Sequence, residues 1–312
     1  MSRAGSPVWL SDMDPPRRPA PPPLQRGAWN PRANEEGGVS SQARTDRARH
    51  FFLARVALLL TVLASVIIYA VRDHSARSAR RAWRRPLDVA LVLLERGALD
   101  PDALADFERR VPALEQALED EYRRYGGSFR PIRFTRFGPV PERVATPRAS
   151  ADPGPFEPLR VSYDLFWFAR ESDAAAHVVG SFDGTIYVAL SPPRSAKRAL
   201  VEGIGQDGGR IAVTSIELSE DSVDFGLFVV THELLHLLGA SDRYAADGSA
   251  LLPEGLGDPE QEPLYPQASA EVMARGRVIE PGLEVPPSDL AELRVGPQTA
   301  AEIGWLRPPG AP

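Results

Sequence analysis

The sequence contains no cysteine, a single lysine, Lys197, and only five histidines among its 312 residues. Without cysteine there is no disulfide framework and no thiolate that could bind a metal or act as a nucleophile. The formal net charge of −6 leaves no dominant basic surface for phosphates, so nucleic acid is not expected as a partner. The lack of cysteine fits either side of a membrane and indicates no compartment.

Apolar residues are scarce at the N-terminus, where proline, arginine and glycine dominate residues 1–50. Such a composition cannot bury enough surface to offset the entropy of the chain, so we predict a disordered tail over 1–50. A docking segment for a partner is the functional alternative. The C-terminal residues 307–312 are also predicted to be disordered.

One long apolar run follows this tail. The stretch FFLARVALLLTVLASVIIYAV, residues 51–71, contains one charged side chain, Arg55, and can cross a ~30 Å hydrocarbon layer as a helix. Fifty residues precede the run and no small-residue cleavage site follows it, which argues against a cleaved signal peptide. We therefore predict a single transmembrane anchor over 51–71 and a basic juxtamembrane linker over 72–85.

The arginines on the two sides of the anchor do not decide its orientation. The larger number follows the apolar run, which by the positive-inside rule slightly favours a cytoplasmic C-terminal side. That arrangement would require export of the fifty-residue tail. The arginines before the run are Arg44, Arg47, Arg49 and Arg55, and those after it are Arg72, Arg77, Arg80, Arg81, Arg84 and Arg85.

From residue 86 onward the pattern is typical of a mixed α/β (α+β) domain. Alternating or β-branched segments predict strands, and apolar spacing of three and four residues predicts helices. Pro112 can kink or split the first of these helices. The predicted strands are 87–97, 130–138, 159–170, 184–190 and 209–218, and the predicted helices are 100–126, 219–238 and a short one within 295–305.

The helix of about five turns that ends at Gly239 carries two histidines four residues apart, His232 and His236, on one face. Two such imidazoles can bind one Zn²⁺, and Glu233 stands beside them as a candidate general base. A tetrahedral catalytic zinc needs a third protein ligand, and a sharp turn at Gly239 can bring Asp242 back to the metal. The alternative is a leucine-rich core helix with two buried histidines. Because histidine is scarce here, the H-E-x-x-H spacing arises by chance in only roughly half a per cent of chains this size.

The stretch HELLHLLGASD resembles the extended zinc signature of the metzincin metalloproteases, H-E-x-x-H-x-x-G-x-x-H. Asp242 stands at the position of the third histidine, as in snapalysin-like metzincins. Metzincins also carry a methionine in a tight turn after the zinc helix, and Met273 follows the second histidine by 37 residues. The resemblance implies His232, His236 and Asp242 as zinc ligands, Glu233 as general base, Gly239 as the turn glycine and Met273 as the turn methionine.

This resemblance covers residues 86–306 and implies a metzincin-like twisted mixed sheet packed on the zinc-binding helix, preceded by a single transmembrane helix. Either 184–190 or 209–218 would then be the edge strand that pairs with a peptide substrate, unless both are core strands. The implied function is a membrane-anchored zinc endopeptidase with an extracytoplasmic catalytic domain and a protein or peptide substrate. The alternative is a catalytically inactive domain that binds a metal or a partner at the membrane surface.

The sequence leaves three assignments near the signature open: the oxyanion-stabilising residue, the third ligand and a calcium site. Some metzincins have an oxyanion-stabilising tyrosine two residues after the turn methionine, where this sequence has Arg275, and Tyr244, Tyr265 or Arg275 itself are candidates for that role. Glu271 is the alternative third ligand. The acidic, proline-rich segment 246–267 could bind calcium, although a solvated loop is favoured.

Overall fold

The computed structural model describes residues 37–147, 154–193, 202–205, 208–245 and 248–306. The predicted disordered segment 307–312 and residues 1–36 of the predicted tail lie outside the described residues. The chain forms two compact units, one ending at Ile67 and the other beginning at Ile68.

Helix α1, Gly37–Arg81, contains the predicted apolar run and continues through most of the predicted juxtamembrane linker. Among the described residues, one helix, Arg49–Arg81, is long and apolar enough to cross a membrane. No part of the most apolar stretch of this helix is buried within the protein. Residues 37–50, which the sequence places in the disordered tail, form the first turns of α1.

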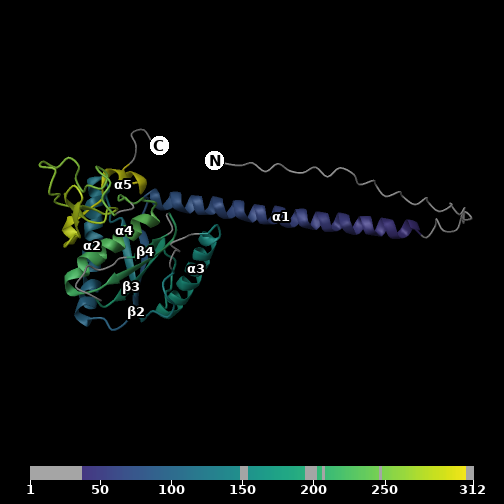
Figure 1. Ribbon diagram of the computed structural model, residues 1–312, viewed down its shortest axis with the longest axis horizontal. Helices are drawn as coiled ribbons and strands as arrows, with labels where there is room; N and C mark the ends of the chain where they lie inside the picture. Colours follow the sequence, from purple (N-terminus) through teal and green to yellow (C-terminus); the bar gives the residue numbers. More distant parts are fainter. Residues whose placement is uncertain (1–36, 148–153, 194–201, 206–207, 246–247, 307–312) are drawn as a thin grey trace, which may run out of the picture. The chain divides into compact units, whose positions relative to one another are not determined.

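The unit that begins at Ile68 is built on a five-stranded sheet with the strand order β2-β1-β3-β5-β4 (Figure 1). Four strands are parallel, and β4 runs antiparallel along one edge. The strands predicted at 87–97, 130–138, 184–190 and 209–218 are confirmed as β1, β2, β3 and β5. The five strands of the sheet are β1 Leu87–Glu95, β2 Ile132–Pro141, β3 Gly184–Ser191, β4 Glu202–Gly205 and β5 Ile211–Glu217.

Helices cover both faces of this sheet. Parallel neighbours need a crossover connection, and helix α2, Pro101–Arg124, supplies it between β1 and β2. Helix α3, Glu157–Ala176, connects β2 to β3 on the other side of β1. Because both crossovers are expected to be right-handed, they place the two helices on opposite faces. Strand β1 is therefore apolar on both faces from Val89 to Leu94: Val89, Leu91 and Leu93 pack with α2, and Val92 and Leu94 pack with α3.

The prediction of a strand over 159–170 was wrong, because these residues belong to α3. The helix packs Leu165 and Phe168 against the sheet but leaves Leu159 and Phe166 exposed on its other side. Apolar residues on both faces of a helix produce the dense, alternating pattern of a buried strand. The strand order decides the matter, since two parallel strands on either side of β1 require a crossover helix between them.

Of the two alternatives left open for β3 and β5, an edge strand or two core strands, the structure confirms the two core strands. Strand β3 lies between β1 and β5, and β5 lies between β3 and β4. The edge belongs to β4, whose sequence EGIG is too short and too rich in glycine to give a strand signal.

Pro112 does not split α2, which is continuous from Pro101 to Arg124. Proline has no N–H, so the carbonyl of Glu108, four residues earlier, loses its helical partner. Arg136 of β2 replaces that partner by donating from Nη1 to the Glu108 carbonyl at 2.9 Å. The helix therefore tolerates its internal proline through a contact with the neighbouring strand.

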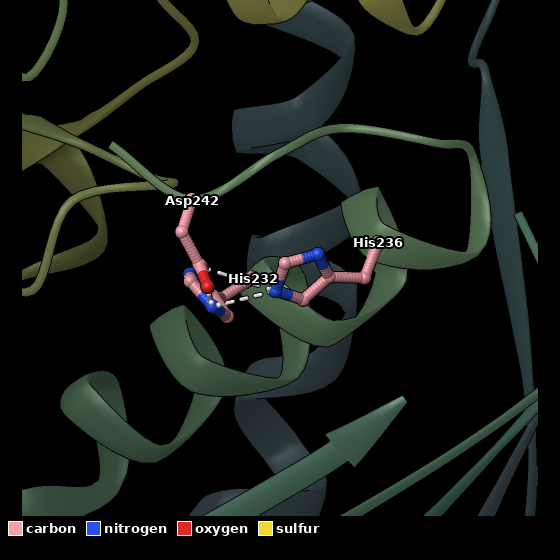
Figure 2. A group of neighbouring side chains, drawn as sticks. All are labelled: His232, His236 and Asp242. Carbon is pink, nitrogen blue, oxygen red and sulfur yellow. Dashed lines mark hydrogen bonds and ion pairs between the residues drawn. The ribbon is translucent and has the colours of Figure 1, made fainter. Parts of the chain in front are cut away.

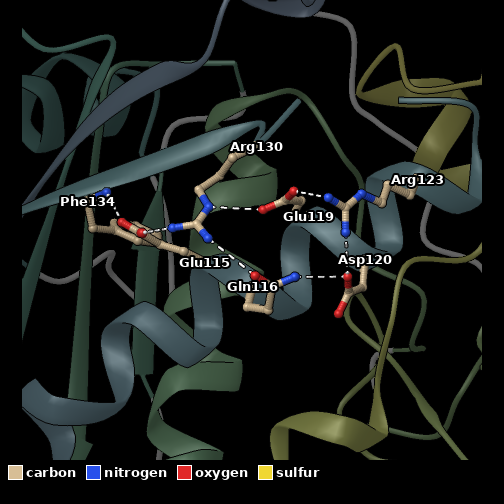
Figure 3. A network of polar contacts seen from close by, with 7 residues as sticks. All are labelled: Glu115, Gln116, Glu119, Asp120, Arg123, Arg130 and Phe134. Carbon is tan, nitrogen blue, oxygen red and sulfur yellow. Dashed lines mark hydrogen bonds and ion pairs between the residues drawn. The ribbon is translucent and has the colours of Figure 1, made fainter. Parts of the chain in front are cut away.

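A polar network ties α2 to the outer edge of β2 (Figure 3). Arg130 donates to Glu119 at 3.0 Å, to Glu115 at 3.1 Å and to Gln116 at 3.2 Å. Glu115 in turn accepts the backbone N–H of Phe134 at 2.7 Å. This contact occupies a backbone donor that an edge strand would otherwise leave unpaired.

Helix α4, Val223–Leu237, follows β5 and packs on β3 and β5, beside α2. The remaining chain forms short elements and ends in helix α5, Pro297–Glu302, which confirms the short helix predicted within 295–305. The predicted mixed α/β class is confirmed. The other short elements are η2 Glu220–Ser222, β6 Ala270–Glu271, β7 Arg277–Glu280, β8 Leu283–Val285, η3 Leu290–Glu292 and β9 Leu293–Arg294.

Candidate metal site

The helix that carries the two histidines is shorter than predicted. Ser219 and Ser222 form a capping box around the 3-10 turn η2, in which the backbone N–H of Ser219 donates to the Ser222 hydroxyl at 2.8 Å. The α-helix itself begins one residue later, at Val223. Most of its side chains are buried, so its orientation against the sheet is fixed by packing on several sides.

Gly239 ends α4 in the predicted way. Its φ of 90° lies in the left-handed region, where glycine carries no steric penalty. The next N–H, that of Ala240, donates to the Leu235 carbonyl at 3.0 Å and closes the last turn. The chain then reverses and carries Asp242 back over the helix face that bears His232 and His236 (Figure 2).

Three side-chain atoms converge at this face. The Nε2 atoms of His232 and His236 lie 3.0 Å apart, and Asp242 Oδ1 lies 3.3 Å from the first and 3.2 Å from the second (Figure 2). The two imidazoles are largely buried, with 15% and 13% of each side chain exposed, whereas 41% of the Asp242 side chain is exposed. The cluster is therefore held by the core on one side and reached by solvent on the other.

The other ring nitrogen of each histidine contacts a backbone carbonyl. His232 Nδ1 lies 2.9 Å from the Val272 oxygen, and His236 Nδ1 lies 2.9 Å from the Ala240 oxygen. A carbonyl only accepts, so each Nδ1 carries the proton and each neutral ring turns the lone pair of Nε2 toward the other. Two lone pairs and a carboxylate oxygen this close repel one another unless a cation lies between them.

The distances also fit a tetrahedral zinc ion. With metal–ligand bonds of about 2.0–2.1 Å, neighbouring ligands in a tetrahedron lie about 3.3 Å apart. The three separations here, 3.0, 3.2 and 3.3 Å, have that size. Two neutral imidazoles and one carboxylate are ligand types that zinc accepts. The donor set therefore fits zinc in number, type and spacing.

The charges around the cluster keep Asp242 ionised. Burial would raise the pKa of Asp242, but its close contacts with the two imidazoles outweigh that effect and hold the pKa well below its ordinary range. Burial likewise would lower the pKa of His236, but Asp242 and the charge of Glu233 outweigh it and raise the pKa. The cluster thus attracts positive charge, as a cation site should.

Met273 and Glu271 lie beneath the cluster in one tight turn, which the N–H of Ala274 closes by donating to the Glu271 carbonyl at 3.0 Å. Met273 is fully buried, and the residue before it, Val272, is the one that contacts His232. Glu271 is fully buried as well and directs its carboxylate away from the histidines. The carboxylate accepts from the N–H groups of Met273, Ala274 and Gly296 and from the Thr299 hydroxyl.

These contacts assign Asp242 and not Glu271 to the cluster. Sequence reasoning missed the role that Glu271 has instead, which is to join the methionine turn to the start of α5. Its only sequence signal is a charged residue inside an apolar stretch, two positions before Met273. Glu233, the candidate base, is buried on α4 with 4% of its surface exposed.

Tyr244 and Arg275 lie beside the histidines. The Tyr244 ring stacks on His232 with 6.3 Å between ring centroids, and the Arg275 guanidinium lies 4.6 Å from the Tyr244 ring centroid. Burial, followed by the negative charge of Asp242, raises the pKa of Tyr244, so the phenol keeps its proton. Both residues therefore remain candidates for stabilising negative charge near the cluster.

Among the described residues, His232, His236 and Asp242 form the one group of three or more acidic or histidine side chains close enough to hold a metal ion. The acidic segment 246–267, of which 246–247 lie outside the described residues, contributes no such group of side chains. The calcium site considered for that segment has no support from side-chain positions.

No family model and no curated protein sequence matches this chain. Among solved structures, the crystal structure of archaemetzincin from Methanopyrus kandleri is similar, with a TM-score of 0.29 and 16% sequence identity. The match covers 54% of this chain and 80% of the archaemetzincin chain. This is a distant structural similarity.

Proposed function

We propose that the chain is a membrane-anchored, zinc-dependent endopeptidase of metzincin type. The observation that supports it is the convergence of His232, His236 and Asp242, with both Nδ1 atoms held by carbonyls and both Nε2 atoms turned toward Asp242. In this proposal these three side chains hold the zinc ion.

Three protein ligands leave the fourth tetrahedral position for water or substrate, which is the arrangement of catalytic rather than structural zinc sites. The exposure of Asp242 gives solvent and substrate access to that side of the cluster. A structural site would instead have four protein ligands and would be closed. No fourth acidic or histidine side chain joins the group among the described residues.

Zinc bound here would lower the pKa of a water molecule and polarise the scissile carbonyl. Glu233 follows the first ligand on α4 and acts in this proposal as the general base, accepting the proton of the attacking water and returning it to the leaving amine. Its burial excludes bulk water from the carboxylate, so the proton stays within the site. Tyr244 and Arg275 stabilise the oxyanion that forms on the carbonyl.

The membrane and substrate assignments extend this proposal. The apolar part of α1 spans the bilayer once, and the N-terminal tail stays in the cytoplasm because its export would be costly. The catalytic domain is then extracytoplasmic, and its substrate is a protein or peptide. Protease protection of the domain in intact cells tests this orientation: digestion by protease added outside supports it, and protection contradicts it.

The catalytic proposal is tested with the purified full-length chain and a peptide library, with cleavage products read by mass spectrometry. We expect Glu233→Gln to keep its zinc and to lose roughly 10²-fold or more of the cleavage rate, because the general base is removed and the ligands are not. Glu280→Gln, which removes an exposed carboxylate on β7, is the matched control and should cleave like the wild type.

Two results would contradict the proposal. One is equal cleavage by the wild type and Glu233→Gln. The other is a folded, zinc-loaded wild type that cleaves nothing in the library, which would support the inactive metal-binding or partner-binding domain instead.

A further inference from the structure

A cleft lined by arginines lies between the end of α1 and the end of α4. Its volume is ≈ 240 Å³, and Gly208 and residues 237–239 form the wall opposite α1. Arg77, Arg80 and Arg81 line the other wall from positions i, i+3 and i+4 of one helix. That spacing places all three side chains on one helix face.

Arg80 is the buried member of this group, with 7% of its surface exposed. Its Nη2 donates to the carbonyls of Gly208 and Gly209, at 2.9 Å each. Its Nε is buried and has no hydrogen-bond partner among the residues that the structure describes. A buried guanidinium donor without an acceptor is costly, so an acceptor from outside the chain would satisfy it.

The ion pairs between described residues neutralise only part of the positive charge of the cleft. Arg80 takes part in no ion pair between described residues, Asp73 pairs with Arg77, and Asp183 pairs with Arg85. Burial, together with the nearby charges of Arg210 and Arg77, lowers the pKa of Arg80. An anion in the cleft would supply the acceptor that Arg80 Nε lacks and would neutralise the remaining positive charge.

The cleft lies close to where the chain leaves the membrane in the proposed function, on which this inference rests. Arg77 follows Val71, the last residue of the apolar run, by six residues, or about 9 Å along a helix. The polar layer on each side of the hydrocarbon is roughly 5–8 Å thick. An arginine side chain at that position therefore reaches the depth of the lipid phosphates.

We propose that this cleft binds the phosphate group of an anionic lipid headgroup. Guanidinium groups match phosphate oxygens in a planar, two-pronged geometry, and Arg77, Arg80 and Arg81 present three of them to one volume. Inorganic phosphate has the same chemistry, but the short distance along the helix from Val71, where the apolar run ends, to Arg77 favours the lipid. The lipid would hold the catalytic unit against the membrane at the point where α4 ends.

The test compares the retention of phosphatidylglycerol and phosphatidylcholine by the purified full-length chain, titrated and read by native mass spectrometry. The cleft variant is Arg77→Gln/Arg81→Gln, which leaves the buried Arg80 in place. The matched control is Arg72→Gln/Arg84→Gln, which removes the same charge from exposed positions of the same segment outside the cleft. Melting temperatures of both variants establish that they are folded.

We expect the wild type to retain phosphatidylglycerol in preference to phosphatidylcholine with one saturable site. The cleft variant should lose at least about tenfold more phosphatidylglycerol affinity than the control, because paired guanidinium–phosphate contacts exceed general charge attraction. Equal losses in the two variants, or no preference in the wild type, would overturn the proposal.

A second arm distinguishes the source of the phosphate. Excess inorganic phosphate should leave the bound lipid in place, and its displacement of the lipid from the wild type would assign the cleft to a soluble anion instead. Glu233→Gln should bind lipid like the wild type. A failure of lipid binding therefore leaves the peptidase proposal untouched, and a failure of zinc binding leaves the lipid site untouched.

Discussion

Hydrogen bonds to two backbone carbonyls and one buried carboxylate hold the candidate metal site in place. The Val272 and Ala240 carbonyls fix the ring orientation of His232 and His236. Glu271 fixes the turn that contains Val272 by accepting four hydrogen bonds from around it. The residues that would touch the metal thus depend on a buried carboxylate that does not touch it.

Replacing that carboxylate should cost stability but leave the metal ligands intact. Glu271→Gln keeps the shape of the side chain but turns an NH₂ group toward backbone N–H donors, so we expect unfolding free energy to fall by roughly 2–3 kcal/mol. Urea titration of the purified chain measures the loss, with Glu280→Gln as the control. The folded variant should retain zinc like the wild type. A stable, folded Glu271→Gln without zinc would show instead that the hydrogen bonds of Glu271 are required to position His232 for the metal.

Among the elements, α4 and the turn that ends it decide where Asp242 lies. The turn depends on the left-handed backbone of Gly239, and a Cβ added there would meet no atom within 4 Å. The position therefore excludes other residues by backbone conformation and not by lack of space. The offset between Gly239 and Asp242 is what brings the third ligand back over the helix face.

Gly239→Ala isolates that conformational effect. We expect it to lower the unfolding free energy by about 1–2 kcal/mol and to weaken zinc binding, because alanine shifts the turn toward ordinary backbone angles. Gly282→Ala is the matched control, since Gly282 has a similar φ of 82° and the same open surroundings but lies in the β7–β8 hairpin. Zinc titration should separate them. If both variants bind zinc equally well, the turn at Gly239 does not position Asp242.

At the scale of the whole molecule, one ion pair joins the chain that leaves α1 to the central sheet. Arg85 donates to both carboxylate oxygens of Asp183, at 2.7 and 2.8 Å, and the backbone N–H of Asp88 donates to the same carboxylate at 3.0 Å. Burial would raise the pKa of Asp183, but the Arg85 and Asp88 contacts outweigh it and lower the pKa below the ordinary 3.8. The pair therefore stabilises the fold only while Asp183 is ionised.

The Arg85–Asp183 ion pair predicts a stability difference between the wild type and Asp183→Asn that depends on pH. A carboxylate whose pKa is lower in the folded state stabilises the fold above its unfolded pKa, and that contribution is lost as pH falls through the folded pKa. We expect Asp183→Asn to be less stable by about 1 kcal/mol at neutral pH, because the partner Arg85 is mostly exposed. Melting temperatures below pH ~4 should converge with those of the wild type. A constant difference down to acidic pH would contradict this role.

The sequence predicted those parts of the molecule that depend on local patterns. The zinc-signature helix, the turn at Gly239 and four of the five strands follow from capping, glycine and apolar spacing. The helix over 159–170 could not be predicted in this way, because its two apolar faces give the pattern of a buried strand. Its helical structure follows from the strand order, since the parallel strands β2 and β3 lie on opposite sides of β1 and need a crossover between them. The role of Glu271 depends on Thr299 and Gly296, which are distant in sequence.

The most direct test of the proposed metal site is the zinc content of the purified full-length chain and of Asp242→Ala, measured by elemental analysis on protein shown to be folded. The three converging side chains predict about one zinc per wild-type chain and a clear loss in the variant, since two imidazoles alone make an incomplete site. A folded wild type without zinc would contradict the metal site and the hydrolase with it. Full zinc in Asp242→Ala would contradict the assignment of the third ligand.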